Sequence, residues 1–372
     1  MRKETNAGHK DIYSSSPFGC FLSPFSLSID RMEKLILVNF EKDPDKYYNT
    51  FELQQANDIS GRKRFLVIAY RKDGAADIYY QSDYPFCSQT SILNDVSLFV
   101  CPLEDAEFEI TDEKLQVCFS FKDRFGRQIK VVVHERHRSK KKPFFLLAPV
   151  GVVAKQPTSF PVYSLYAMSF TIRKHTEIEI EIDNIKHKPD SFPLPVECAG
   201  NFFTRYSGDT FNVDWNKNYQ GPLKSIVPDQ ENKAADNGTN YELINNGGHF
   251  EIKRIGTKNG KHELTIEFSP PVPDILCLKN DLKLGGTFKV KTDNTNSHIC
   301  GEYMLHRHEN DVSMELHPNQ GWQPNEKRLI LSLLFMIVKV FREWPKSYTW
   351  RATINLENIT QPEMKSGWER KT

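Results

Sequence analysis

The sequence lacks the cysteine spacing of a disulfide framework or of a zinc finger. Its 372 residues contain seven scattered cysteines and no CxxC pair. An odd number of cysteines, several of them within apolar runs, indicates free thiols in a reducing compartment. We therefore expect a cytoplasmic protein without disulfide bonds.

Long apolar runs and an excess of one charge are also missing. The most apolar run covers residues 329–341, which is shorter than the roughly 20 residues of a membrane-spanning helix. The chain has 49 basic and 48 acidic residues, so no overall field favours nucleic acid. These features predict neither a transmembrane segment nor a nucleic-acid partner, and they leave the oligomeric state open.

The common nucleotide-binding and hydrolase motifs do not occur in the sequence. There is no G-x-G-x-x-G run, no Walker loop and no G-x-S-x-G elbow, which argues against the most frequent enzymes built on those turns. No clear motif requires a cofactor.

Aromatic residues are abundant, with 25 Phe, 14 Tyr and 5 Trp. Such residues fit the pleated, half-buried surface of a sheet, and they fall in many short alternating runs separated by turn residues. Residues 249–268 illustrate the pattern, because Asn259-Gly260 predicts a tight hairpin turn between two strands. The fold class that we predict is mainly β, with antiparallel sheets forming barrel- or sandwich-like domains.

Composition changes suggest the domain boundaries. A flexible N-terminus is expected over residues 1–15, an N-terminal β domain over 16–152 and a C-terminal β domain over 160–372. Within the second domain, residues 216–240 are polar and show no periodicity. They predict a long loop, which could be a lid over a cavity or a plain connection.

One segment near the C-terminus has the punctuation of a helix. Pro324 opens an apolar run that ends before Pro345, which predicts a long helix over about 325–344. The alternating residues 348–357 then predict a final strand, and the tail after it is expected to be loose. A meander followed by a helix and a strand is similar in element order to lipocalin-type barrels, although no residue motif of that family is present.

The stretch LHRHENDVSMELH, residues 305–317, combines three histidines and three carboxylates. A turn at Asn310-Asp311 would place His306 opposite Glu315. Alternation would then put the apolar residues on one face and His306, His308, Glu315 and His317 on the other. Imidazole and carboxylate ligands suit a divalent metal such as zinc, iron, manganese or copper. The four residues are candidate ligands if their face lines a cavity, and ordinary surface groups if it meets solvent.

Two further sets of residues are candidates for function. Tyr206 and Asp209 lie close together in TRYSGD and could act as acid catalysts, although turns often use such residues. Aromatic residues of the predicted C-terminal domain could line an apolar interior, namely Phe288, Tyr303, Trp322, Tyr348 and Trp350.

These features support three hypotheses. The protein could enclose an apolar small molecule and act on it as an acid-catalysed cyclase, isomerase or hydratase. It could instead be a metal-dependent enzyme using the hairpin cluster. It could also be a non-catalytic interaction protein, so whether it is an enzyme is left open.

Overall fold

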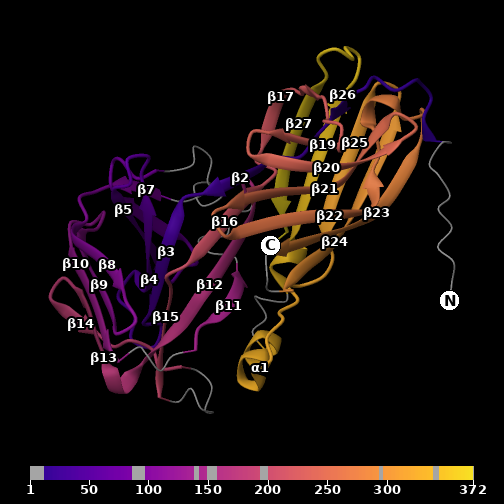
Figure 1. The fold of residues 1–372 in the computed structure, drawn as a ribbon. Helices are drawn as coiled ribbons and strands as arrows, with labels where there is room; N and C mark the ends of the chain where they lie inside the picture. Colours follow the sequence, from indigo (N-terminus) through magenta and orange to yellow (C-terminus); the bar gives the residue numbers. More distant parts are fainter. Residues whose placement is uncertain are drawn as a thin grey trace.

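The computed structural model describes residues 12–85, 97–137, 142–148, 157–192, 200–292, 296–337 and 343–371. It confirms the predicted fold class, because the chain is mainly β and its strands form antiparallel sheets (Figure 1). Three sheets make up most of the molecule, and a two-stranded sheet joins β1 to β18. The bounds of that pair are Phe21–Leu22 and Ser225–Ile226.

The first ten-stranded sheet has the order β2-β16-β12-β15-β3-β4-β5-β6-β7, and β11 pairs with β12. Its pairs are antiparallel except for the parallel pair β6–β7. In chain order the strands are Leu27–Asp30 (β2), Met32–Asn39 (β3), Tyr48–Asn57 (β4), Lys63–Arg71 (β5), Ala76–Tyr80 (β6), Ser97–Val100 (β7), Phe144–Ala148 (β11), Phe160–Ile172 (β12), Asn201–Ser207 (β15) and Thr210–Trp215 (β16).

A five-stranded sheet packs on the β3–β6 part of this sheet. Its order is β14-β13-β10-β9-β8, with bounds Glu104–Ile110 (β8), Lys114–Lys122 (β9), Gln128–Arg136 (β10), Thr176–Ile182 (β13) and Ile185–His187 (β14). Alternation explains the packing, since Val117 and Phe119 on β9 point inward and meet Phe51 and Leu53 on β4 in one buried core.

The second ten-stranded sheet is an antiparallel meander from β19 to β27 that curls, and β17 adds to it beside β27 (Figure 1). Its order is β17-β27-β26-β25-β24-β23-β22-β21-β20-β19. The strands are Tyr219–Pro222 (β17), Lys233–Asp236 (β19), Thr239–Asn246 (β20), His249–Asn259 (β21), His262–Val272 (β22), Lys283–Thr292 (β23), His298–His308 (β24), Asp311–Pro318 (β25), Tyr348–Asn355 (β26) and Glu363–Arg370 (β27).

An aromatic core joins the two ten-stranded sheets. Phe160 on β12 lies 5.9 Å from Trp215 on β16 and 4.9 Å from Trp368 on β27, measured between ring centroids. Trp215 also meets Phe288 on β23 at 5.2 Å. Rings of this size bury large apolar areas, so this contact holds the two halves of the molecule together.

Strand pairing crosses the boundary that composition suggested between residues 152 and 160. β12, β15 and β16 follow that boundary in sequence, yet β15 pairs with β3 and β16 pairs with β2. The division into domains 16–152 and 160–372 stays a prediction. Residues 12–15, which we expected to be flexible, make backbone hydrogen bonds to the segment around residue 277.

The helix is shorter than predicted. Helix α1 covers Leu329–Ile337 and therefore begins four residues after the predicted start at 325; residues 338–342 of the predicted helix lie outside the described part. The preceding residues 325–328 are not helical; there the Arg328 side chain bonds the Lys142 carbonyl, and the Glu326 side chain accepts the Arg328 backbone N–H. None of the described helices is long and apolar enough to cross a membrane.

The residues after the final predicted strand are not loose. Strand β26 appears where a strand was predicted, and β27 then pairs along its whole length. Trp368 on β27 is buried, and its indole N–H donates to the Trp215 carbonyl at 3.0 Å. The charged residues around Trp368 had hidden the strand: Lys365 and Glu369 are exposed on its outer face, whereas Arg370 shares the face of Trp368 and lies over the Tyr348 ring.

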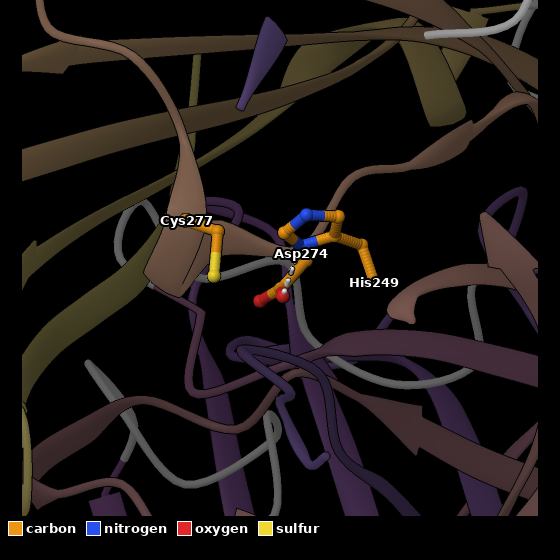
Figure 2. A group of neighbouring side chains, drawn as sticks. All are labelled: His249, Asp274 and Cys277. Carbon is orange, nitrogen blue, oxygen red and sulfur yellow. Dashed lines mark hydrogen bonds and ion pairs between the residues drawn. The ribbon is translucent and has the colours of Figure 1, made fainter. Parts of the chain in front are cut away.

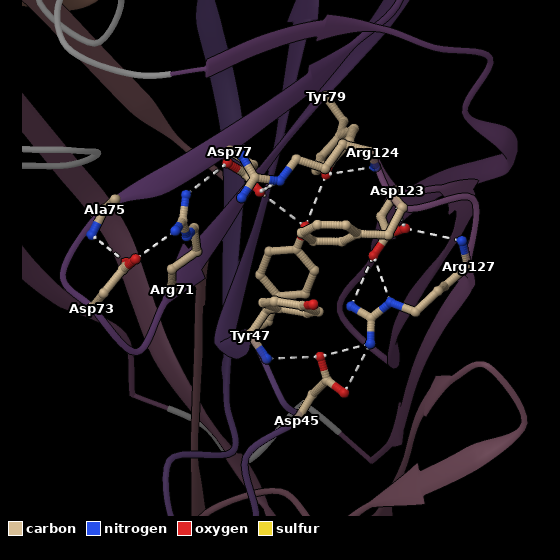
Figure 3. A network of polar contacts seen from close by, with 12 residues as sticks. Asp45, Tyr47, Arg71, Asp73, Ala75, Asp77, Tyr79, Asp123, Arg124 and Arg127 are labelled. Atoms are coloured by element: carbon tan, nitrogen blue, oxygen red, sulfur yellow. Dashed lines mark hydrogen bonds and ion pairs between the residues drawn. The ribbon is translucent and has the colours of Figure 1, made fainter.

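A buried polar network closes one end of the core between the five-stranded sheet and the first ten-stranded sheet (Figure 3). Arg127 bonds Asp45 at 3.0 Å and Asp123 at 2.8 Å, and the three side chains are only 17%, 10% and 0% exposed. Burial alone would raise the pKa of Asp45, but hydrogen bonds from the backbone N–H groups of Tyr47 and Lys46 and from Arg127 hold it below its ordinary value.

We predict that Arg127→Met destabilises the protein by about 3–5 kcal/mol, because two buried carboxylates lose their cation. Urea unfolding at neutral pH would measure this loss. The matched control is Arg62→Met, since Arg62 is 68% exposed in its pair with Asp58 and exposed pairs contribute little. Equal losses in the two variants would contradict the assignment.

Candidate functional site

The histidine hairpin consists of β24 and β25, and its register differs from the predicted one by two residues. His306 lies opposite Ser313, and Glu315 lies opposite Met304. The turn falls at Glu309-Asn310, with Glu309 in the left-handed region at φ 52°. A shift of two residues preserves the faces, so the predicted division into an apolar and a polar face is still seen.

The polar face of the hairpin points away from the core. Tyr303, Leu305, Val312, Met314 and Leu316 are buried, while the residues between them are partly or fully exposed. The predicted ligands have separate partners, as three contacts show. The His308 ring lies 2.8 Å from Asp281, Glu315 pairs with Arg351 at 3.0 Å, and His317 lies 3.4 Å from the Thr349 hydroxyl.

The ring centroids of His306 and His308 are 6.2 Å apart. Among the described residues, the one His, Cys, Asp and Glu group whose ligand atoms converge is His249, Asp274 and Cys277, which come from other elements. The four predicted ligands of the hairpin therefore lie on one surface, but their ligand atoms do not converge on a position that a single metal ion could occupy.

The five aromatic residues that we expected to line a cavity are all buried, with exposures of 0–3%, namely Phe288, Tyr303, Trp322, Tyr348 and Trp350. They pack against other rings. Tyr348 meets Phe160 at 5.1 Å and Trp350 meets Phe25 at 6.1 Å. In this structure their rings help to fill the interior between the sheets.

Tyr206 and Asp209 point to different partners. The Tyr206 hydroxyl donates to Glu135 at 3.2 Å within the core of the five-stranded sheet. The Asp209 carboxylate instead bonds His262 and Lys261, both at 2.7 Å, at a turn of the second ten-stranded sheet. The structure does not join the two residues into one catalytic pair.

A pocket of about 500 Å³ lies where the N-terminal segment meets the edge of the second ten-stranded sheet. Nine of its fifteen lining residues come from 216–240, the segment predicted to be a long loop. That segment holds the short strands β17, β18 and β19. Strands of two to four residues show no readable alternation, which is why the sequence did not reveal them.

The lining of this pocket combines buried apolar residues with charged ones. Phe25, Tyr241 and Met364 are buried, with exposures of 4–5%. Lys217 and Lys224 bring two positive charges to the lining and Asp236 brings one negative charge, and Lys217 also lies 3.6 Å from the carboxylate of Asp214.

Asp214 is a buried acid that faces Lys217. Its exposure is 1%, and its other carboxylate oxygen accepts from the Ser159 hydroxyl at 2.8 Å. Burial raises the pKa of Asp214, and the negative charge of Asp30 on the neighbouring strand raises it further, while Lys217 lowers it less. Burial also raises the pKa of Asp30.

Comparison with protein-family models, with curated proteins and with solved structures finds no match to this chain. Function therefore has to be argued from the residues themselves.

Asp214 and Asp209 should give opposite pH dependences of stability. Because the folded pKa of Asp214 is raised above the unfolded value of about 3.9, its contribution to stability is present below pH 4 and is lost as pH rises toward neutrality. We expect Asp214→Asn to abolish this fall in the free energy of unfolding as pH rises. Urea unfolding of wild type and variant between pH 4 and pH 8 would measure it.

Asp209 supplies the matched comparison. Burial alone would raise its pKa, but the hydrogen bonds from Lys261 and His262 hold it below the ordinary value. Its stabilising contribution is present above the unfolded pKa and is lost as pH falls through the folded one. Asp209→Asn should therefore flatten the acid side of the stability profile, and parallel profiles for the two variants would refute both assignments.

Proposed function

We propose that this protein binds a small, largely apolar molecule that carries a negatively charged or hydrogen-bond-accepting group. The observation that carries the proposal is the pocket of about 500 Å³. Its volume falls within the range of ordinary small-molecule sites, which combine apolar walls with a few polar groups. Lys224 is exposed at the pocket and forms no ion pair among the described residues, so its ammonium group can pair with a ligand.

The pocket is continuous with the aromatic core through Phe25. The Phe25 ring stacks on Phe268 at 4.9 Å and lies 6.1 Å from Trp350. Trp350 was predicted to contact a ligand. In this proposal it does not line the pocket but packs against Phe25, which does. A ligand that displaces Phe25 would change the surroundings of the Trp350 indole, so its fluorescence would report binding.

Binding is better supported than acid-catalysed cyclisation, isomerisation or hydration. Neither Tyr206 nor Asp209 lines the pocket. The acidic groups in the lining, Asp236, Tyr219 and Tyr241, were not among the predicted catalysts. The nearby buried acid is Asp214, whose pKa burial raises. That carboxyl group lies behind Lys217 and is not part of the lining.

We expect Leu223→Asp to weaken binding at least about tenfold, because it places a charge against an apolar ligand in the pocket wall. The measurement is displacement of a hydrophobic fluorescent dye by long-chain fatty acids. Val227→Asp is the matched control, since Val227 lies four residues along the same segment, is 74% exposed and does not line the pocket.

The contribution of the Lys224 charge to binding can be tested separately. Lys224→Glu should weaken the binding of a fatty acid severalfold and leave the binding of the corresponding neutral alcohol unchanged. No dye or fatty-acid binding by the wild type, or equal binding by the Leu223 and Val227 variants, would rule the pocket out as the site.

A second candidate function, as a non-catalytic interaction protein, is favoured by helix α1. Leu329, Leu333 and Met336 are 81%, 49% and 59% exposed and recur at i, i+4 and i+7, which places them on one helical face. A face of this kind suits a protein partner. Loss of a co-purifying partner on Leu333→Glu would support this reading, and a monomer with no partner would count against it.

A cytoplasmic location remains part of the proposal. It is supported by the cysteines, because all five that the structure describes are free thiols, namely Cys20, Cys101, Cys118, Cys277 and Cys300.

A further inference from the structure

Three side chains with metal-binding atoms converge away from the proposed pocket. They are His249 at the start of β21, and Asp274 and Cys277 at the two ends of the 3₁₀ helix η4, Ile275–Cys277 (Figure 2). One ligand atom from each lies within 4.8 Å of the others. All three side chains are buried, with exposures of 8%, 1% and 0%.

Local structure explains why the thiol and the carboxylate meet. Residues three apart in a 3₁₀ helix lie on the same side, and Asp274 and Cys277 have that spacing. Asp274 caps η4 with one carboxylate oxygen, which accepts from the Leu276 N–H at 3.2 Å. Its other oxygen points to the His249 ring nitrogen Nδ1, 3.3 Å away. The loop D-I-L-C thus presents an oxygen and a sulfur beside an imidazole.

Two carboxylates are buried at this group without a direct ion pair to a lysine or arginine in the part of the chain that the structure describes. Asp274 and the nearby Glu251 have exposures of 1% and 3%, and Tyr13 bonds both residues through its hydroxyl. The one arginine beside η4 is Arg307 among the described residues, and its guanidinium bonds the carbonyls of Leu276 and Leu278 and not the carboxylates. Buried carboxylates are ordinarily paired with cations or metals, so a bound cation would pair with Asp274 directly.

The N-terminal segment 12–17 covers the group. The Tyr13 ring stacks on the His249 ring with centroids 3.8 Å apart and an angle of 16°. The Ser14 N–H donates to the Cys277 carbonyl at 2.9 Å, and the Cys277 thiol donates to the Ser16 carbonyl at 3.6 Å. The segment therefore contacts all three candidate ligand residues, since the Tyr13 hydroxyl also accepts from the Asp274 N–H at 3.3 Å, and it shields them from solvent.

We propose that His249, Asp274 and Cys277 bind a divalent transition-metal ion, zinc first of all, beneath segment 12–17. One nitrogen, one oxygen and one sulfur ligand match the preferences of zinc. Ligands at about 2.0–2.3 Å from the ion lie within about 4 Å of each other, so these atoms, which are within 4.8 Å of one another, would draw together by less than about 1 Å on binding. The imidazole and thiolate favour zinc over magnesium or calcium. Three protein ligands leave a fourth position for water.

The first test measures zinc bound to the purified full-length chain after dialysis. We expect one zinc ion per chain, and a thiolate-to-metal absorption band when cobalt replaces zinc. Cys277→Ser should remove the band and weaken zinc binding at least about 100-fold, more than the effect of losing a group that only orients a ligand. Cys300→Ser is the matched control, because Cys300 lies on β24 outside the cluster.

The double substitution His306→Ala and His308→Ala separates this site from the surface hairpin. It should leave zinc content unchanged. Zinc that disappears in this variant but persists in Cys277→Ser would overturn the proposal, as would a wild type that binds no zinc.

Tyr13→Ala tests the cover over the site. It should speed the transfer of zinc to a chelator at least tenfold and leave the cobalt band in place, because the ligands themselves are retained. This variant keeps the proposal testable if Cys277→Ser does not fold. An unchanged transfer rate would show that segment 12–17 does not enclose the ion.

Discussion

The contact on which the rest of the structure depends is the packing of Phe160 and Trp215 against the rings of the second ten-stranded sheet. Both residues belong to strands that hydrogen-bond within the first ten-stranded sheet, yet their side chains lie in the core of the second. Alternation makes this possible, because one face of β16 carries Trp215 and the other carries Asp214. One face of β16 therefore packs into the apolar core, and the opposite face carries a buried acid.

The N-terminal segment connects the two sites that we propose. Residues 12–17 cover the His249 cluster, residues 23–26 form a wall of the pocket, and β2 then joins the first ten-stranded sheet. About ten residues of chain therefore separate the cover of the His249 cluster from the wall of the pocket, and one stretch of backbone contributes to both sites.

Alternation in the sequence was enough to predict the sheets, the faces of the hairpin and strand β26, because side-chain direction in a strand follows from position alone. The hairpin register was missed by two residues, since it depends on the left-handed conformation of Glu309. Just before the start of α1, Arg328 bonds Lys142, which is far away in sequence and could not be paired with it from the local pattern. The pocket and the His249 cluster were not predictable, because their residues come from short strands and loops that only the tertiary fold assembles.

The docking of the N-terminal segment has a consequence for how the chain reaches this state during synthesis. Tyr13 bonds a residue 238 positions later, and Ser14 bonds one 264 positions later. At translation rates of about 5–20 residues per second, the partners of this segment emerge roughly 10–50 seconds after it does. This segment leaves the ribosome well before its partners, so it must be among the last to reach its native position, and until then Tyr13 and Ser14 lack these hydrogen-bond partners.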